Sequence, residues 1–224
     1  MNLLALVASA YWLAQSKQQF IQSAETHTRN IAGAVERNLS ASVDKIDFAL
    51  LHLVDDVQRL ASSRNSMDGR SLNAAFAGMK ARLPEIEGLR VADREGRVFL
   101  GSGMDLSKPV SITDRDYYQA LRAAKDHPLW ITKPVMGRLV KHPIVIFARR
   151  YDDARGNFAG VVFATIALDY FQHLLERYDL GAQGTIILRD LDLGLIVRNP
   201  PIPDQPSGQV GNSAVSNEFR KLFA

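Results

Sequence analysis

The 224-residue sequence contains no cysteine. Disulfide bonds, thiolate metal sites and a cysteine nucleophile are therefore excluded. Because cysteine-free chains occur in reducing and in oxidising compartments, this absence assigns no compartment. The 27 Lys and Arg residues and the 24 Asp and Glu residues are scattered without a run of one sign. The basic stripe typical of nucleic-acid-binding proteins is missing, so we expect no nucleic-acid partner.

Sequence motifs typical of enzymes are also missing. The five histidines never form a His-x-x-x-His pair or another metal-like cluster, and no Walker loop or Gly-x-Ser-x-Gly elbow occurs. The segment Gly101-Ser102-Gly103 lacks the third glycine of a dinucleotide-binding loop. We therefore expect no catalytic residue, no metal and no cofactor. A periplasmic hydrolase with a triad assembled across the fold remains an alternative.

The first 16 residues carry no charge and include the apolar run Leu3 to Ala14. A helix of that length spans about 18 Å, whereas the hydrocarbon core of a bilayer is roughly 30 Å thick. We interpret residues 1–16 as the outer part of a membrane anchor that begins upstream, with Tyr11 and Trp12 at the interface. A signal peptide ending near residues 8–10 and a buried N-terminal helix remain alternatives.

Proline and glycine are scarce in the stretch that follows. No proline precedes Pro84, and Gly33 is the only glycine before Gly69. Apolar or small residues recur there at steps of three and four, which is the period of one helix face. This pattern predicts one helix from about Ala14 to Ser63, about 75 Å long, and we assign residues 17–64 to this long helix. Two helices with an unmarked break remain an alternative. A helix of this length needs a surface to lie on, so a homodimer is a further expectation.

Beyond residue 64 the pattern changes to short apolar runs separated by turn residues, beginning with the turn cluster at residues 65–69. Helical segments lie between some of these runs. We therefore expect an α+β fold, in which the long N-terminal helix packs on a five-stranded antiparallel sheet within residues 65–180. The five expected strands are Leu89 to Ala92, Val98 to Gly101, Trp130 to Thr132, Ile144 to Tyr151 and Phe158 to Ile166.

Residues 181–224 begin with a pattern similar to the first hairpin. Thr185 to Leu188 and Leu193 to Arg198 again flank an acidic, glycine-containing turn, so Gly96 and Gly194 are expected to be equivalent positions. This predicts the start of a second, incomplete module of the same kind. The chain is thus expected to be truncated at both ends.

Several segments together resemble the double Cache (PAS-like, tandem) sensor domains. They are Thr113 to Leu121, Pro134 to Arg138, the strand Ile144 to Arg150, Gly160 to Val162, and Leu168 to Phe171. Their order and spacing are similar to the sensor regions of transmembrane diguanylate cyclases and histidine kinases. The resemblance covers roughly residues 20–200. It implies a sensor anchored in the bacterial inner membrane, facing the periplasm, whose membrane-distal module binds a small molecule.

The resemblance also implies a ligand site. In the amino-acid-binding branch of the family, an Arg-x-Trp-Tyr-like motif holds the ligand carboxylate, and Arg115, Tyr117 and Tyr118 match this motif with tyrosine in place of tryptophan. Thr165 stands where that branch has an aspartate for the ligand amine. This departure favours a carboxylate or other small anion without an ammonium group.

Arginine supplies bidentate bonds to a carboxylate, and tyrosine combines a hydroxyl with an apolar ring. The expected ligand-binding residues are Arg115, Tyr117, Tyr118, Trp130 and Arg138. The alternative for each is a structural role, as a solvent-facing arginine or a core aromatic residue. We expect an extracytoplasmic small-molecule sensor coupled to an output domain outside this chain. A helical scaffold without a ligand is the alternative from another class.

Overall fold

The computed structural model describes residues 3–62, 69–102 and 110–221. The expected boundary between residues 64 and 65, and residues 65–68 of the expected turn cluster at residues 65–69, lie outside the described residues. Gly69, the last residue of that cluster, is the first residue of a helix. The chain divides into two compact units, Met1–Ser42 and Val43–Ala224. Helix α1, Leu3–Ser62, is uninterrupted and contributes residues to both units. One helix is therefore correct here, and the alternative of two helices with a break is not.

The first unit consists of the helical residues of α1 up to Ser42. Large apolar side chains are exposed along it, including Trp12 and Phe20, which are 75% and 77% exposed. Across the described ranges of the chain, no helix combines the length and the apolarity needed to span a membrane.

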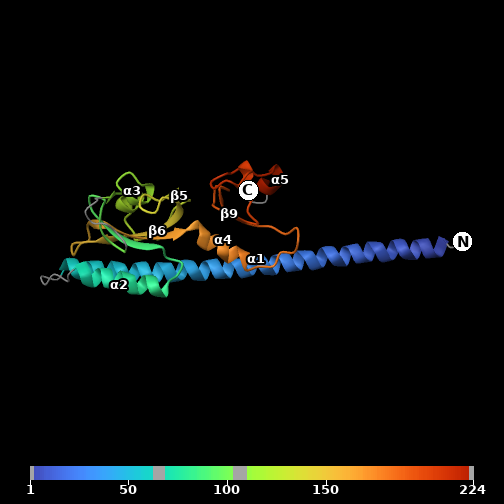
Figure 1. The fold of residues 1–224 in the computed structure, drawn as a ribbon, viewed down its shortest axis with the longest axis horizontal. Coiled ribbons are helices and arrows are strands. Elements are labelled where there is room, and N and C mark those ends of the chain that lie inside the picture. Colours follow the sequence, from blue (N-terminus) through green and yellow to red (C-terminus); the bar gives the residue numbers. More distant parts are fainter. Residues whose placement is uncertain (1–2, 63–68, 103–109, 222–224) are drawn as a thin grey trace. The chain divides into compact units, whose positions relative to one another are not determined.

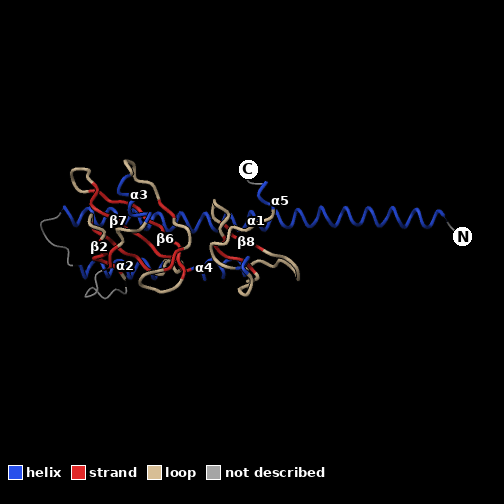
Figure 2. Tube along the Cα trace, turned by 90° about the horizontal axis from the view of Figure 1, so that it is seen from above, coloured by secondary structure: helices blue, strands red, loops and turns tan. Residues whose placement is uncertain are grey.

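The second unit is built on an antiparallel sheet of seven strands, in the order β3-β2-β1-β7-β6-β4, with β5 also paired to β6 (Figures 1 and 2). All five expected strands are present. Two short strands that the sequence did not indicate, β3 and β5, pair with β2 and β6. The strands are Gly88–Asp93 (β1), Arg97–Gly101 (β2), Val110–Ser111 (β3), Trp130–Ile131 (β4), Val135–Met136 (β5), Pro143–Asp152 (β6) and Phe158–Ala167 (β7).

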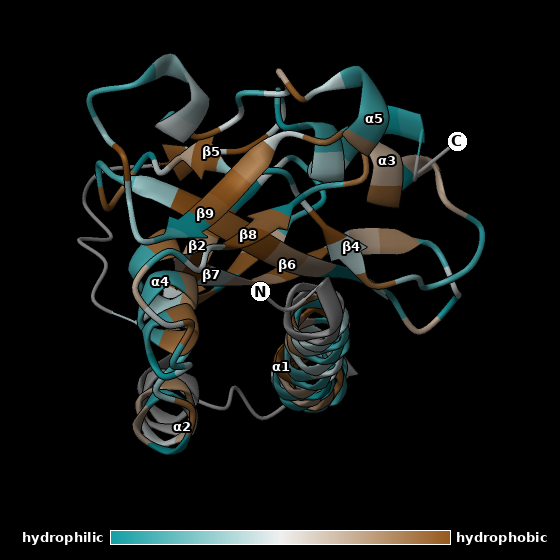
Figure 3. Ribbon diagram, turned by 90° about the vertical axis from the view of Figure 1, so that its right-hand side faces the viewer, coloured by the Kyte–Doolittle hydropathy of each residue, from teal (hydrophilic) through white to brown (hydrophobic). Residues whose placement is uncertain are grey.

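Helices cover both faces of this sheet. Helix α2, Gly69–Arg82, and residues 43–62 of α1 lie on one face, and α3, Asp116–Ala123, lies on the other (Figure 3). Alternate residues of a strand point to opposite faces, and both faces of β6 and β7 are buried. This explains why these strands appear in the sequence as continuous apolar runs without an alternating pattern.

The adjacent residues Arg149 and Arg150 on β6 illustrate the two faces. Arg149 forms a bidentate ion pair with Asp47 of α1, with N–O distances of 2.5 and 2.8 Å. Arg150 is buried on the α3 side, where it donates to Asp152 at 2.5 and 2.9 Å and to the Ala124 carbonyl at the end of α3. The sequence predicted that the two arginines point to opposite faces of the sheet, because adjacent strand residues alternate. It did not show which arginine points to which face.

Three hairpin turns share one hydrogen-bond pattern, in which an aspartate Oδ1 accepts from the amides two and four residues later. The aspartates are Asp93, Asp153 and Asp190. The left-handed residue of each turn comes three positions after the aspartate and is Gly96, Gly156 or Leu193. Gly96 therefore corresponds to Leu193, at an offset of 193 − 96 = 97 residues. The expected equivalence of Gly96 and Gly194 is wrong by one residue.

A separate two-stranded sheet follows α4, Leu168–Glu176. It pairs β8, Ile186–Arg189, with β9, Leu195–Asn199, close to the strands expected for the second module. The one-turn helix Pro206–Gly208 and α5, Asn217–Lys221, come after it. Thr185 and Leu193, which we expected in the strands, lie outside them.

The packing of α1 on the sheet can be tested by truncating two neighbouring leucines of this helix and comparing the loss in the free energy of unfolding. Leu50 is fully buried, whereas Leu51 is 39% exposed. Leu50→Ala should lower the free energy of unfolding by about 3 kcal/mol because it removes buried apolar surface and leaves a cavity. Leu51→Ala should change it by about 0.5 kcal/mol or less. Urea denaturation of both variants measures the difference, and equal losses would contradict this packing.

Candidate functional site

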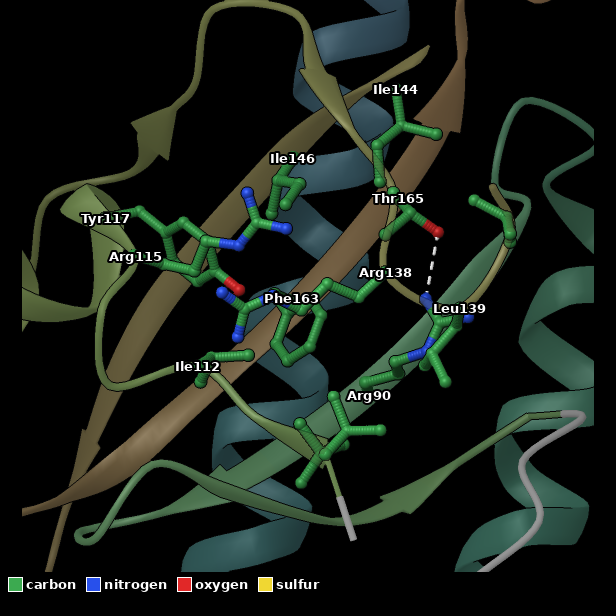
Figure 4. A pocket seen from close by; sticks show the side chains of 14 residues that line it. Arg90, Ile112, Arg115, Tyr117, Arg138, Leu139, Ile144, Ile146, Phe163 and Thr165 are labelled. Atoms are coloured by element: carbon green, nitrogen blue, oxygen red, sulfur yellow. Dashed lines mark hydrogen bonds between the residues drawn. The ribbon is translucent and has the colours of Figure 1, made fainter. Parts of the chain in front are cut away.

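A pocket lies on the α3 face of the sheet, between the central strands, the start of α3 and the loop that joins β5 to β6 (Figure 4). Its floor comes from β1, β6 and β7, and most of its lining is aliphatic or aromatic. Its charged lining residues are all arginines. The lining residues are Arg90, Val98, Val110, Ile112, Arg115, Tyr117, Gly137, Arg138, Leu139, Val140, Ile144, Ile146, Phe163 and Thr165.

Arg90 is the most deeply placed of the three arginines. It is 6% exposed, and its Nη1 donates to Thr165 Oγ1 at 3.1 Å, the bond drawn in Figure 4. Among the described residues, its buried Nε has no hydrogen-bond partner. Burial lowers the pKa of Arg90, and the negative charge of Glu87 opposes this effect. Because arginine keeps its proton in proteins, a positive charge is held in a largely apolar site.

Gly88 provides the space for this guanidinium. Gly88 and Arg90 lie two residues apart on β1, and a Cβ atom added to Gly88 would lie 2.7 Å from Arg90 Nη1. Gly88 is paired with Thr165 on the neighbouring strand. The missing side chain of Gly88 therefore lets the guanidinium lie back along β1 and reach the Thr165 hydroxyl.

Arg115 and Tyr117 come from the start of α3. Arg115 is the residue before the helix, and its Nη2 donates to the Met136 carbonyl at 3.2 Å. Tyr117 is 2% exposed, and burial raises the pKa of its hydroxyl, while the positive charges of Arg115, Arg138 and Arg90 act in the opposite direction. The hydroxyl therefore remains protonated and lies within the field of all three guanidinium groups. No group in the described ranges accepts a hydrogen bond from it.

Arg138 lies at the more exposed side of the pocket and already has partners. Its guanidinium donates to the Asp114 carboxylate and to the Ser111 carbonyl. The bond from Arg138 lowers the pKa of Asp114, so this carboxylate is ionised near neutral pH. Arg138 is thus neutralised locally by a residue that does not line the pocket.

The loop that carries Arg138 is anchored at its far end. His142 Nε2 and Glu87 Oε1 are 2.8 Å apart, which ties the start of β6 to the residue before β1. The backbone amide of Gly137 donates to the His142 carbonyl at 3.0 Å and closes the loop. A Cβ atom at Gly137 would lie 2.4 Å from Val140 Cγ2, so a larger residue here would force Val140 or the loop to shift.

The space left between the lining side chains is about 30 Å³, enough for about two water molecules. Larger ligands need some side chains to move outward. Arg138 and Leu139 are the candidates because they are exposed and belong to the loop. The lining contains three arginines and no Asp or Glu, so the formal charge of the lining side chains is positive.

The pocket brings together three of the five residues expected from the sequence, Arg115, Tyr117 and Arg138. Tyr118 and Trp130 do not line it. The hydroxyl of Tyr118 donates to the Arg94 carbonyl at 2.5 Å, and its ring packs edge-on against Phe158. Trp130 lies on the edge strand β4 and is 37% exposed. The structure gives these two residues structural contacts and offers no support for contact with a ligand in this pocket.

The sequence interpretation missed Arg90, although a signal was present. Arg90 stands between Leu89, Val91 and Ala92 in a strand with an otherwise apolar pattern. A lone charge at such a position is either paired or functional, because burying it unpaired is costly. Its connection with Thr165 depends on strand pairing over 75 residues, which the sequence alone does not show.

The sequence model of the Cache domain matches residues 14–221. The chain belongs to the Cache domain family. This match spans nearly the whole chain and confirms the expected Cache sensor domain and its α+β fold. A search of curated protein sequences finds no match.

Solved structures with the same fold include several sensor domains. The extracellular domain of rpHK1S-Z16, described as a histidine kinase, is 26% identical with a TM-score of 0.70, covering 89% of this Cache domain and 75% of that chain. The sensory domain of the Campylobacter jejuni chemoreceptor Tlp3 with isoleucine bound is 13% identical with a TM-score of 0.61, covering 92% and 81%. The sensor domain of the V. cholerae histidine kinase DctB is 14% identical with a TM-score of 0.62, covering 91% and 75%. At these identities, the last two show the fold alone.

The His142–Glu87 pair predicts a pH dependence of stability. The hydrogen bond to Glu87 is the main reason that the pKa of His142 is raised. A raised folded-state pKa adds stability that is complete below the unfolded-state value of about 6.5 and is lost as the pH rises through the folded-state value. Removing the imidazole with His142→Gln should therefore lower Tm more at pH 5.5 than at pH 8.5, as measured by thermal unfolding. His173→Gln, on α4, is the matched substitution against which the effect of His142→Gln is compared. A pH-independent difference for His142→Gln would contradict the assignment.

Proposed function

We propose that this Cache domain is the extracytoplasmic small-molecule sensor of a membrane-bound bacterial signal transducer, and that its pocket binds a small carboxylate or another small anion. In this proposal it is not an enzyme. The output domain, a histidine kinase or diguanylate cyclase, lies outside the chain. The protein resides in the inner membrane with this domain facing the periplasm.

The convergence of Arg90, Arg115 and Arg138 on one pocket without an acidic lining residue carries the proposal. Guanidinium groups bind carboxylates and other oxyanions through paired hydrogen bonds, which are stronger where water is excluded. The Tyr117 hydroxyl adds a neutral donor at the same place. The apolar side chains around these groups supply the surface that buries the rest of a small ligand.

A series of contacts supports coupling between the pocket and α1. Helix α3 begins next to the pocket lining residues Arg115 and Tyr117, and the carbonyls near its end accept hydrogen bonds from Arg150 of β6. The next residue back on the same strand, Arg149, is ion-paired with Asp47 of α1. A ligand that shifts α3 would therefore act on the sheet and on the helix behind it. It changes the signalling state only to the extent that it binds one arrangement better.

A thermal-shift and calorimetry screen of small carboxylates, other small anions and small amines, on the full chain, tests the proposal. One or more anions should raise Tm, with stabilisation of about 2.7 kcal/mol at a ligand concentration of 100 times Kd. Arg115→Ala should weaken binding of that anion about tenfold or more because a charged hydrogen-bonding group is lost.

Arg155→Ala is the matched control, since it removes the same charge from an exposed hairpin turn away from the pocket. It should leave the affinity within about twofold of the unmodified chain. A chain that binds no anion would contradict the proposal, as would equal losses in both variants. Indifference to every compound, with an unchanged oligomeric state, would favour the scaffold interpretation.

A further inference from the structure

The charges around the pocket are unequally compensated. The ionisable lining residues are Arg90, Arg115, Arg138 and Tyr117. Two carboxylates lie near them. Asp114 is bonded to Arg138 and acts on Arg115 and Tyr117 through its charge. Glu87 is bonded to His142 through Oε1 and acts on Arg90 through its charge, while its buried Oε2 has no hydrogen-bond partner among the described residues. Within the described ranges, neither Arg90 nor Arg115 contacts a carboxylate.

The unused donors belong to these two arginines. Arg90 makes one side-chain hydrogen bond, to the neutral Thr165 hydroxyl, and its Nε is buried without a partner among the described residues. Arg115 makes one, to the Met136 carbonyl, from a single nitrogen. A guanidinium has five N–H donors, so both groups can still form paired bonds to an oxyanion.

The burial of Arg90 distinguishes the three lining arginines from a cluster of charges on the protein surface. At 6% exposure, bulk water contributes little to its solvation. A buried charge without an ionic partner is unfavourable, so one negative charge near Arg90 would relieve that group, and a second negative charge could pair with the partly exposed Arg115. A monoanion would compensate only one of them, because Arg138 is already occupied by Asp114.

We propose that the ligand of this pocket is a compact dianion, held between Arg90 and Arg115 with the Tyr117 hydroxyl as a third donor. This inference rests on the proposed function and specifies the charge of its ligand. The free space of about 30 Å³ limits the ligand to a small species, such as a short dicarboxylate or a tetrahedral oxyanion, and either one requires Arg138 and Leu139 of the loop to move outward. A ligand of either kind carries two units of negative charge, and both arginines line the pocket in which it would bind.

Isothermal titration calorimetry of the full chain with two matched pairs of compounds tests the charge. Succinate is compared with succinamate, in which one carboxylate becomes a neutral amide of similar size. Sulfate is compared with methyl sulfate, which is tetrahedral but carries a single charge. We expect the dianion to bind at least about tenfold more tightly in one pair, which is about 1.4 kcal/mol. If succinate shows this preference, the ligand is a dicarboxylate. If sulfate shows it, the ligand is a tetrahedral oxyanion.

The remaining outcomes separate this inference from the proposed function. Equal affinities within each pair would overturn the dianion and leave an anion sensor. Binding of monocarboxylates in the broader screen, with no binding of succinate or sulfate, would also overturn it. Absence of binding by every anion tested would overturn both.

The proposed preference for a dianion can also be tested by substituting Thr165. Its Oγ1 is 3.1 Å from Arg90 Nη1, so Thr165→Asp would place a carboxylate against that guanidinium. The preference for the dianion should then fall from at least about tenfold to about twofold or less, since one positive charge is already compensated. Thr165→Asn, of the same size and uncharged, should keep the preference.

The same loss of preference in both Thr165 variants would overturn the role of charge. Because Thr165 is 2% exposed, Tm is measured for both variants. Arg115→Gln is a second variant that tests the charge, at a partly exposed position before α3. It should also reduce the preference for the dianion over the monoanion to about twofold or less. An unchanged preference in Arg115→Gln would overturn the inference even if the Thr165 variants did not fold.

Discussion

The burial of the Arg90 guanidinium is the constraint on which the rest of the pocket depends. A charge in an apolar site is tolerated only where the structure supplies compensating bonds. Here the sheet supplies one hydroxyl from Thr165 and the open space over Gly88. Both come from residues that face each other across the β1–β7 pairing, so the position of the charge is fixed by strand register. Arg90 lines the same pocket as Arg115 and Arg138, and its buried Nε has no hydrogen-bond partner among the described residues.

The two faces of the sheet carry different features of the domain. The face toward α3 carries the pocket and its arginines, and the opposite face is covered by α2 and residues 43–62 of α1. Strand β6 belongs to both, since Ile144 and Ile146 line the pocket while Arg149 is bonded to α1. Because strand residues alternate, one rigid strand connects ligand contacts with helix contacts without an intervening loop.

The sequence predicted the parts of the fold that depend on local pattern. A helical period without proline identified α1, and glycine-containing turns between apolar runs identified the hairpins. The short strands β3 and β5 were missed because two residues form no pattern. The turn equivalence failed because Leu193 takes the left-handed conformation that we expected of Gly194. An aspartate hydrogen bond, and not the glycine, defines these turns.

The site was predictable only in part, because the sequence shows local patterns but neither the direction of each side chain nor the pairing of distant strands. Arg115 and Tyr117 came from a contiguous motif, but Tyr118, the next residue on a helix, points to the Arg94 carbonyl. Successive helix residues differ by about 100° in direction, so a linear motif does not specify which tyrosine meets the pocket. Arg90 needed the pairing of β1 with β7, which arises from contacts between residues far apart in the chain.

Binding and folding are linked through these positive charges. Arg90 is poorly solvated, since burial lowers its pKa. A negative ligand offsets this desolvation penalty, so part of the binding free energy is stability that the domain lacks without the ligand. Replacing Arg90 by an apolar residue would remove the same penalty without a ligand. A more stable domain would then be one that no longer responds, which gives a physical reason for a sensor to retain a buried guanidinium.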